Sequence, residues 1–441
     1  MYIVPLAMVV ILSAGVPAET ASLVEDLGSS RYARREAAGA ALVKLGPAAV
    51  PALRVAAGST DPEVRARSAE ILRRIEAGSL TLPTMIGLDF EDIPLAEAIA
   101  SVNAQARLNL VMVSADDPAW RESRVDCRSN GPVPFWTAID LLCSAGRIRH
   151  DPAEVGRPGL GDAAFPLRLG AAVDPGLTSD SGPFRVQLAS IHFQSDLPLT
   201  RNARPSGSRR AATVDAQARR QFYLQVIVAA EPRLKVAQDG PVRITQAVDD
   251  RGNSLLAPTG VSETLRSSGY LGVSSSPSLH LRVDLSRPDA KAEQIGVLRG
   301  EVPVVVTARK AGATAIPLGR AVGRSFRDDR GTCTVEAVRP ATADRPCEID
   351  LAIRNLPGSG EPTGDGGPFR AGPSPERIEI LDERGGVLPW FPTRTSFDGE
   401  VSRTTIALAA PGSPRPDSIR FHEIHLARTA VPFEFRSIAM P

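Results

Sequence analysis

The sequence lacks a net charge of either sign, although charged residues are common in it. Its 441 residues include 51 lysines and arginines and 50 aspartates and glutamates, which leaves a formal net charge of +1. A chain with so even a balance has no overall field that would draw it to nucleic acid or to an anionic membrane surface. We therefore expect no nucleic-acid partner.

Cysteine and histidine, the residues that most often hold transition metals, are scarce. The chain has four cysteines without a Cys-x-x-Cys spacing and five histidines that do not cluster with them. His422 and His425 have the closest spacing, but residues three apart on a strand point to opposite faces. The sequence therefore predicts no metal site, and it predicts no cofactor.

The four cysteines fall into two local pairs, Cys127 with Cys143 and Cys333 with Cys347. Closing a loop of about fifteen residues with a disulfide contributes roughly 3 kcal/mol, which helps small domains outside the reducing cytosol. Two disulfides are one interpretation of this pattern. Buried free thiols are the other, because Cys143 lies four residues after Ile139 on an apolar helix face.

Motifs of the common catalytic sites are also missing. The sequence has no Gly-x-Ser-x-Gly, no His-Glu-x-x-His, no phosphate-binding loop and no complete Gly-rich dinucleotide fingerprint. The acidic pairs Asp249-Asp250 and Asp328-Asp329 lie beside arginine and glycine in sequences typical of turns, where adjacent acids usually cap the backbone. We expect a protein that is not an enzyme.

One long apolar run is present, and it lies at the N-terminus. Residues 3–12 are apolar and are followed by small residues that end in Val16-Pro17-Ala18. This pattern is typical of a cleaved secretory signal, although no lysine or arginine precedes the run; a short buried helix is the alternative. We expect a signal peptide at 1–18 and an exported protein that is periplasmic, envelope-associated or secreted, with no transmembrane segment after cleavage.

Residues 21–78 contain an internal repeat with an offset of thirty residues, in which Arg35, Ala41, Leu42 and Leu45 match Arg65, Ile71, Leu72 and Ile75. Gly46 and Asp61-Pro62 are suited to end and to begin helices. The stretch from Asp61 to Arg65 resembles the helix start of HEAT-type repeats. This resemblance implies paired helices, which serve either as a protein-binding surface or as a stabilising cap.

Residues 84–150 contain a second repeat, with an offset of forty residues. Each half has a proline followed by apolar residues at helical spacing: Pro94, Leu95, Ala98, Ile99 and Val102, then Pro134, Phe135, Ala138, Ile139 and Leu142. Short apolar runs flank both helices, which predicts a small βαβ-βαβ domain. The pattern resembles the short N-terminal domain of secretins and TonB-dependent receptors, and the resemblance implies a docking module.

After residue 150, helical patterns nearly vanish, and short alternating runs are separated by turn sequences such as those at 249–253 and 383–386. These runs predict one or two all-β, sandwich-like domains, at 182–310 and 316–441. Residues 151–181, 201–215 and 355–375 are predicted to be loops. The expected fold class is multidomain α+β, with a helical segment, a βαβ-βαβ domain and β domains in that order.

Two functions fit these observations. The first is a non-catalytic exported protein that mediates protein–protein interaction or scaffolding in the bacterial cell envelope, with envelope proteins as partners. The combination of segments resembles uncharacterised exported proteins of planctomycete-type bacteria. The alternative is a carbohydrate-binding or carbohydrate-processing protein outside the cytoplasm, in which Trp390, within Leu-Pro-Trp-Phe-Pro, forms an exposed ligand platform.

Overall fold

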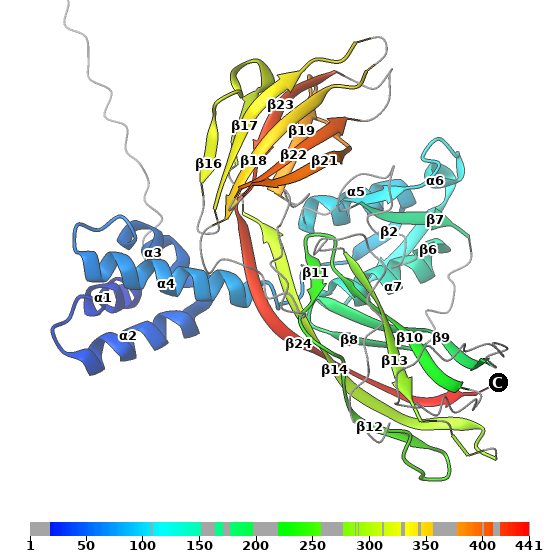
Figure 1. Ribbon diagram of the computed structural model, residues 1–441. Helices are drawn as coiled ribbons and strands as arrows, with labels where there is room; N and C mark the ends of the chain where they lie inside the picture. Colours follow the sequence, from blue (N-terminus) through cyan, green and yellow to red (C-terminus); the bar gives the residue numbers. More distant parts are fainter. Residues whose placement is uncertain are drawn as a thin grey trace, which may run out of the picture. The chain divides into compact units, whose positions relative to one another are not determined.

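The computed structural model describes residues 18–106, 109–150, 164–170, 177–196, 219–256, 277–286, 288–289, 291–310, 313–327, 331–342, 345–355, 377–398, 401–408 and 415–440 (Figure 1). The expected signal peptide at 1–18 lies outside these residues except for Ala18. The fold is mixed α+β with more strand than helix, as expected. Contacts divide the chain into two units, residues 1–80 and 81–441.

The first unit is helical. It consists of α1 (Ala18–Asp26), α2 (Tyr32–Leu45), the 3-10 turn η1 (Gly46–Ala49), α3 (Val50–Ala56) and α4 (Pro62–Ser79). The stretch Tyr32–Ala56 is long and apolar enough to cross a membrane by length and composition alone. Its buried side chains, however, share one core with α1 and α4, which includes Leu27, Ala38, Leu42, Ala49, Leu53, Ile71 and Ile75.

The thirty-residue repeat is visible in the hydrogen bonds of this unit. Arg35 Nη1 donates to the carbonyl of Ser29 at 2.8 Å, and Arg65 Nη1 donates to the carbonyl of Ser59 at 2.9 Å. Each arginine thus closes the turn that precedes its own helix. Asp61 caps α4 as predicted, because its carboxylate accepts the backbone N–H groups of residues 63 and 64.

The second unit begins with short strands and two main helices. They are β1 (Met85–Ile86), β2 (Asp89–Pro94), α5 (Leu95–Ala106), β3 (Leu110–Met112), α6 (Ala119–Glu122), β4 (Arg124–Arg128), β5 (Val133–Pro134), α7 (Phe135–Gly146), β6 (Ile148–His150) and β7 (Phe165–Leu169). The helices predicted after Pro94 and Pro134 are confirmed as α5 and α7. Their apolar faces share one core, with Ile99 and Val102 from α5 and Ile139 and Leu142 from α7.

The strands of the two repeats do not pair within each repeat, as they would in two separate βαβ units. The halves exchange partners, because β1 pairs with β5 and β2 pairs with β4. Strand β7 then lies between β3 and β6, parallel to β3 and antiparallel to β6. The prediction of a loop at 151–181 is therefore wrong at β7 and at β8 (Thr178–Ser181). The apolar run of β7 is too short to stand out from its Pro- and Gly-rich flanks, yet Phe165 and Leu167 are fully buried.

The following strands form two sheets. One contains β8, β9 (Phe184–Asp196), β10 (Arg219–Ala230) and β13 (Ser278–Leu285), in the order β13-β10-β9-β8. The other contains β11 (Lys235–Gln238), β12 (Arg243–Asp249), β14 (Gln294–Arg309) and β24 (Ile424–Ala439). In this second sheet β14 is central, with β11 and β12 along one edge and β24 along the other.

Strand β24 overturns the predicted division into 182–310 and 316–441. It pairs with β14 from Gln294–Ala439 at one end to Arg309–Ile424 at the other (Figure 1). The last strand of the chain therefore belongs to the first β region, and residues 311–422 are inserted between β14 and β24. Local alternation identifies β24 as a strand but holds no information about its distant partner.

The inserted region has its own core between two sheets. One sheet has the order β15-β23-β19-β20 and comprises β15 (Ala315–Pro317), β23 (Pro416–Phe421), β19 (Ile378–Asp382) and β20 (Val387–Leu388). The other has the order β16-β17-β18-β22-β21 and comprises β16 (Ser325–Arg327), β17 (Gly331–Arg339), β18 (Glu348–Asn355), β22 (Val401–Leu408) and β21 (Trp390–Asp398). Buried residues of both sheets meet in one cluster, as in a β-sandwich.

The two predicted turns are confirmed, and they have the same design. Asp249 Oδ1 accepts the backbone N–H groups of residues 251 and 253, and Asp382 Oδ1 accepts those of residues 384 and 386. The third residue after each aspartate is a glycine with positive φ, +84° at Gly252 and +80° at Gly385. Both acids serve as turn caps, which is the interpretation that the sequence favoured for Asp249.

We predict that Gly300→Ala destabilises the sheet of β12, β14 and β24. A Cβ at this position would meet the carbonyl oxygen of Arg243 at 2.6 Å and the ring of Phe433 at 2.9 Å. Overpacking of this kind costs roughly 1–3 kcal/mol. Hydrogen exchange followed by mass spectrometry should show faster exchange in β14 and β24 of the full chain. Gly319→Ala is the control, since its Cβ would meet nothing within 4 Å; equal protection in both variants would contradict the prediction.

Candidate functional site

One cluster of charges is built around Arg185 on β9, whose side chain is 2% exposed. Its guanidinium donates to both carboxylate oxygens of Asp140 on α7, at 2.7 and 2.6 Å, and to both of Asp180 on β8, at 2.7 Å each. It also lies 4.8 Å from the ring centre of Trp136. We call Arg185, Asp140 and Asp180 the Arg185 clamp, because they tie α7 to β8 and β9.

The clamp is held in its charged form. Burial by itself raises the pKa of Asp140, but the hydrogen bonds from Arg185, together with His150, whose Nε2 lies 3.8 Å from Asp140 Oδ1, lower it to about 2. The carboxylate is therefore ionised at neutral pH and accepts hydrogen bonds from a cation that is always protonated. Since neither group has a proton to exchange near neutral pH, the clamp is suited to holding structure and not to acid–base catalysis.

A second cluster anchors the segment before β1. The carboxylate of Glu231, which is fully buried, accepts hydrogen bonds from the backbone N–H and the hydroxyl of Thr84. Arg233 donates to the Thr84 hydroxyl at 2.8 Å, to Glu231 at 3.0 Å and to the carbonyl of Leu82 at 2.6 Å. Together with the Arg185 clamp, this cluster fixes residues 82–150 to the sheet that contains β8, β9 and β10.

A third cluster surrounds Glu379 on β19, which accepts hydrogen bonds from Arg309, Arg420 and His422. Burial raises the pKa of Glu379, but His422 and the two arginines outweigh it and lower that pKa. His422 does not share a strand with His425 as predicted, because β23 ends at residue 421 and β24 begins at residue 424. The described part of the chain contains no group of three or more side chains suited to hold a metal ion.

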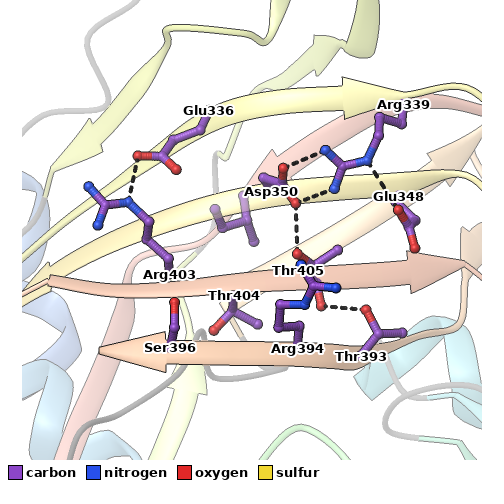
Figure 2. A pocket seen from close by; sticks show the side chains of 11 residues that line it. Glu336, Arg339, Glu348, Asp350, Thr393, Arg394, Ser396, Arg403, Thr404 and Thr405 are labelled. Atoms are coloured by element: carbon purple, nitrogen blue, oxygen red, sulfur yellow. Dashed lines mark hydrogen bonds and ion pairs between the residues drawn. The ribbon is translucent and has the colours of Figure 1, made fainter. Parts of the chain in front are cut away.

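The candidate site is a pocket on the inserted region. It has a volume of about 530 Å³ and lies on the sheet formed by β17, β18, β22 and β21 (Figure 2). All but one of its lining residues are polar, and they are Glu336, Arg339, Glu348, Asp350, Leu351, Thr393, Arg394, Ser396, Arg403, Thr404 and Thr405. The core residues of these strands alternate with the charged ones, so the pocket occupies the face opposite the core.

Ion pairs order the middle of this pocket. Arg339 binds Asp350 through two hydrogen bonds of 2.7 and 2.6 Å and Glu348 through one of 3.1 Å (Figure 2). Thr405 donates its hydroxyl to Asp350 at 2.7 Å. These carboxylates raise the pKa of Arg339, and Arg339 in turn lowers that of Asp350, with a smaller contribution from Thr405. The guanidinium is thereby held in one orientation.

Two further arginines complete the pocket. Arg403 contacts Glu336 and Asp398, each at 3.3 Å, and Figure 2 shows its guanidinium directed toward Glu336. Arg394 is exposed, and no carboxylate of the described residues forms an ion pair with it, although its charge helps to lower the pKa of Asp350. The pocket thus combines three arginines with three acids, and hydroxyl groups lie between them.

This arrangement favours binding over hydrolysis. Glycoside hydrolysis requires one carboxyl group that stays protonated near neutral pH and a second that is free to attack or to activate water. In this pocket the pKa of Asp350 is lowered, and Glu336, Glu348 and Asp350 all accept hydrogen bonds from arginine. The same groups can still bind a ligand, because each carboxylate has about four acceptor positions.

Trp390 does not form the exposed platform proposed from the sequence. Its indole N–H donates to the carbonyl of Ile378 at 3.2 Å, and its ring packs against the core of the inserted region. The next residue, Phe391, points to the opposite face of β21 and is 51% exposed. The exposed aromatic ring of this run is therefore Phe391 and not Trp390.

Of the two interpretations of the cysteines, the structure has the free thiols and not the disulfides: Cys127, Cys143, Cys333 and Cys347 are all free and buried. In the register of β17 and β18, Cys333 lies opposite Ile353, and Ile353 is six residues along the chain from Cys347. Six residues of a strand span about 20 Å, whereas a disulfide needs Cα atoms within about 7 Å. Burial raises the pKa of Cys127 and of Cys347, and that of Cys143 to about 12.

Alternation in the sequence marks two of the strands that form this pocket. Glu348 and Asp350 alternate with Ile349 and Leu351, and Arg403 and Thr405 alternate with Thr404 and Ile406. Each run therefore predicts one charged face. What local sequence cannot supply is the order β17-β18-β22-β21, which brings runs some fifty residues apart into one surface.

We predict that Arg185→Met destabilises the second unit by roughly 1.5–3 kcal/mol, because it removes the charged hydrogen bonds to Asp140 and Asp180. The loss is smaller than for a fully buried pair, since these carboxylates are 41% and 37% exposed and can be hydrated. Urea unfolding of the full chain, monitored by tryptophan fluorescence, measures the loss. Arg299→Met is the control, since Arg299 is half exposed and pairs with Glu434 on the surface, where such pairs contribute at most about 1 kcal/mol.

The same clamp predicts a dependence on pH. The pKa of Asp140 is depressed from 3.8 to about 2 in the folded protein, so its stabilising contribution is complete above about pH 4 and is lost as the pH falls toward 2. Stability should fall less steeply over that range in Arg185→Met. If the free energy of unfolding fell equally steeply with pH in the unaltered protein and in Arg185→Met, Arg185 would not be the group that lowers the pKa of Asp140.

We also predict four reactive thiols after unfolding and few before it. Iodoacetamide should add slowly to the native protein, because the cysteines are buried and the raised pKa of Cys143 keeps its thiol protonated. In guanidinium chloride without a reductant, intact mass should show four adducts. Fewer than four adducts would mean that a disulfide is present.

No protein-family model matches this chain, and the chain matches no curated protein and no solved structure. The similarity of residues 84–150 to the short N-terminal domain of secretins and TonB-dependent receptors stays a prediction from sequence. The same holds for the resemblance to HEAT-type repeats and to exported planctomycete-type proteins.

Proposed function

We propose that this chain is a non-catalytic exported protein of the bacterial cell envelope that holds other envelope proteins in place. The observation that carries the proposal is the buried joint formed by the Arg185 clamp and the Glu231 cluster. Such joints make residues 82–150 a fixed part of a larger body, as a scaffold requires.

The chemistry of the polar clusters supports a role in binding. In the Arg185 clamp, the Glu379 cluster and the pocket, the pKa of a carboxyl group is lowered by cations. General acid catalysis near neutral pH requires the opposite shift. A carbohydrate-binding role through Trp390 is not part of this proposal, because that ring packs against the core.

The helical unit offers a surface for a protein partner. Tyr32 and Val55 are 66% and 78% exposed, so both side chains are accessible to a partner. The resemblance to HEAT-type repeats implies the same role. An exported chain would meet partners in the envelope, which agrees with the expected signal peptide.

We expect a photo-reactive side chain at position 32 or 55 to crosslink to the same envelope protein in living cells. The protein should carry its own signal sequence, and mass spectrometry should identify the adduct and the mature N-terminus. A photo-reactive side chain at Val322, which is 55% exposed on the inserted region, is the control.

Two outcomes would reject the proposal. One is the absence of any adduct specific to positions 32 and 55. The other is an intact Met1 on protein that fractionates with the cytoplasm.

A further inference from the structure

We propose that the polar face of the inserted sheet is a binding site for a neutral oligosaccharide. The register of the four strands β17, β18, β22 and β21 arranges the charged, hydroxyl and aromatic side chains of this face in rows across the sheet. Phe391, Ala407, Glu348 and Arg339 form one row across β21, β22, β18 and β17. Arg394, Thr405 and Asp350 form the next row, about 7 Å along the strands.

The donors and acceptors on this face are fixed before a ligand arrives. Arg339 is held by Asp350 and Glu348, and Thr405 is held by Asp350. Ordering side chains on binding costs affinity, so groups that are already ordered avoid that cost. Asp350 uses three of its roughly four acceptor positions, which leaves acceptor capacity on its own carboxylate and on Glu348.

The charge of the pocket selects a neutral ligand. Glu336, Glu348 and Asp350 balance Arg339, Arg394 and Arg403. A strongly charged ligand would gain no net attraction and would compete with pairs already formed. Hydroxyl groups both donate and accept, so a polyhydroxylated chain can bind carboxylates and guanidinium groups at once.

Phe391 supplies an apolar surface on the same face of the sheet, next to the residues that line the pocket. Its half-exposed ring shares a row with Glu348 and Arg339, beside the small side chain of Ala407. The C–H face of a sugar ring packs against such an aromatic surface, while its hydroxyl groups reach the polar rows. A volume of about 530 Å³ also lies within the range of small-ligand sites.

Isothermal titration of the full chain with defined hexasaccharides tests the proposal. The probes are the β-1,4-glucan, α-1,4-glucan, β-1,4-xylan and β-1,4-N-acetylglucosamine hexamers, with hexagalacturonate as the anionic probe. We expect at least one neutral hexamer to bind, and Phe391→Ala and Thr405→Val each to raise its Kd at least tenfold.

Val387→Ala is the matched control, because Val387 is 48% exposed on the other sheet of the same region; its Kd should equal that of the unaltered protein. Phe391→Tyr keeps the ring and should keep binding, which separates loss of the site from loss of the fold. Binding of hexagalacturonate alone, binding of no neutral hexamer, or an unchanged Kd in Phe391→Ala would each overturn the proposal. The crosslinks expected at positions 32 and 55 do not depend on these results.

Discussion

The second unit depends on the antiparallel pairing of β14 with β24. This ladder joins residues 294–309 to residues 424–439, and both strands contribute buried side chains along most of their length. It also sets where the inserted region leaves and rejoins the sheet, because the N–H of Lys310 donates to the carbonyl of Glu423 at 2.8 Å. Without β24, β14 would lose one entire edge, and the insertion would have only one fixed end.

The elements that sequence predicted well are those whose causes are local. Helices α5 and α7 each begin directly after a proline and have apolar residues at helical spacing. The cap at Asp61 and the turn at Asp249 each depend on a carboxylate that accepts hydrogen bonds from backbone N–H groups a few residues away. These interactions span a few residues. A single stretch of sequence therefore contains all the information that they need.

The errors have the opposite origin. The partner of β24, the position of β7 between β3 and β6, and the distance between Cys333 and Cys347 are all set by strand register over long separations. The pocket depends on the same kind of information, since its charged residues come from four strands. The side on which Trp390 lies was also undecided, because an alternating run specifies two faces without saying which is buried.

Arginine paired with carboxylates has two different consequences in this molecule. Arg185 is a buried arginine that joins two parts of the chain, whereas Arg339 is a half-exposed arginine that orders a surface. The inserted region that presents this surface enters and leaves through Lys310 and Glu423, which lie side by side. A short turn between those two residues would convert β14 and β24 into a simple β-hairpin. The register of that sheet therefore does not depend on the length of the insertion.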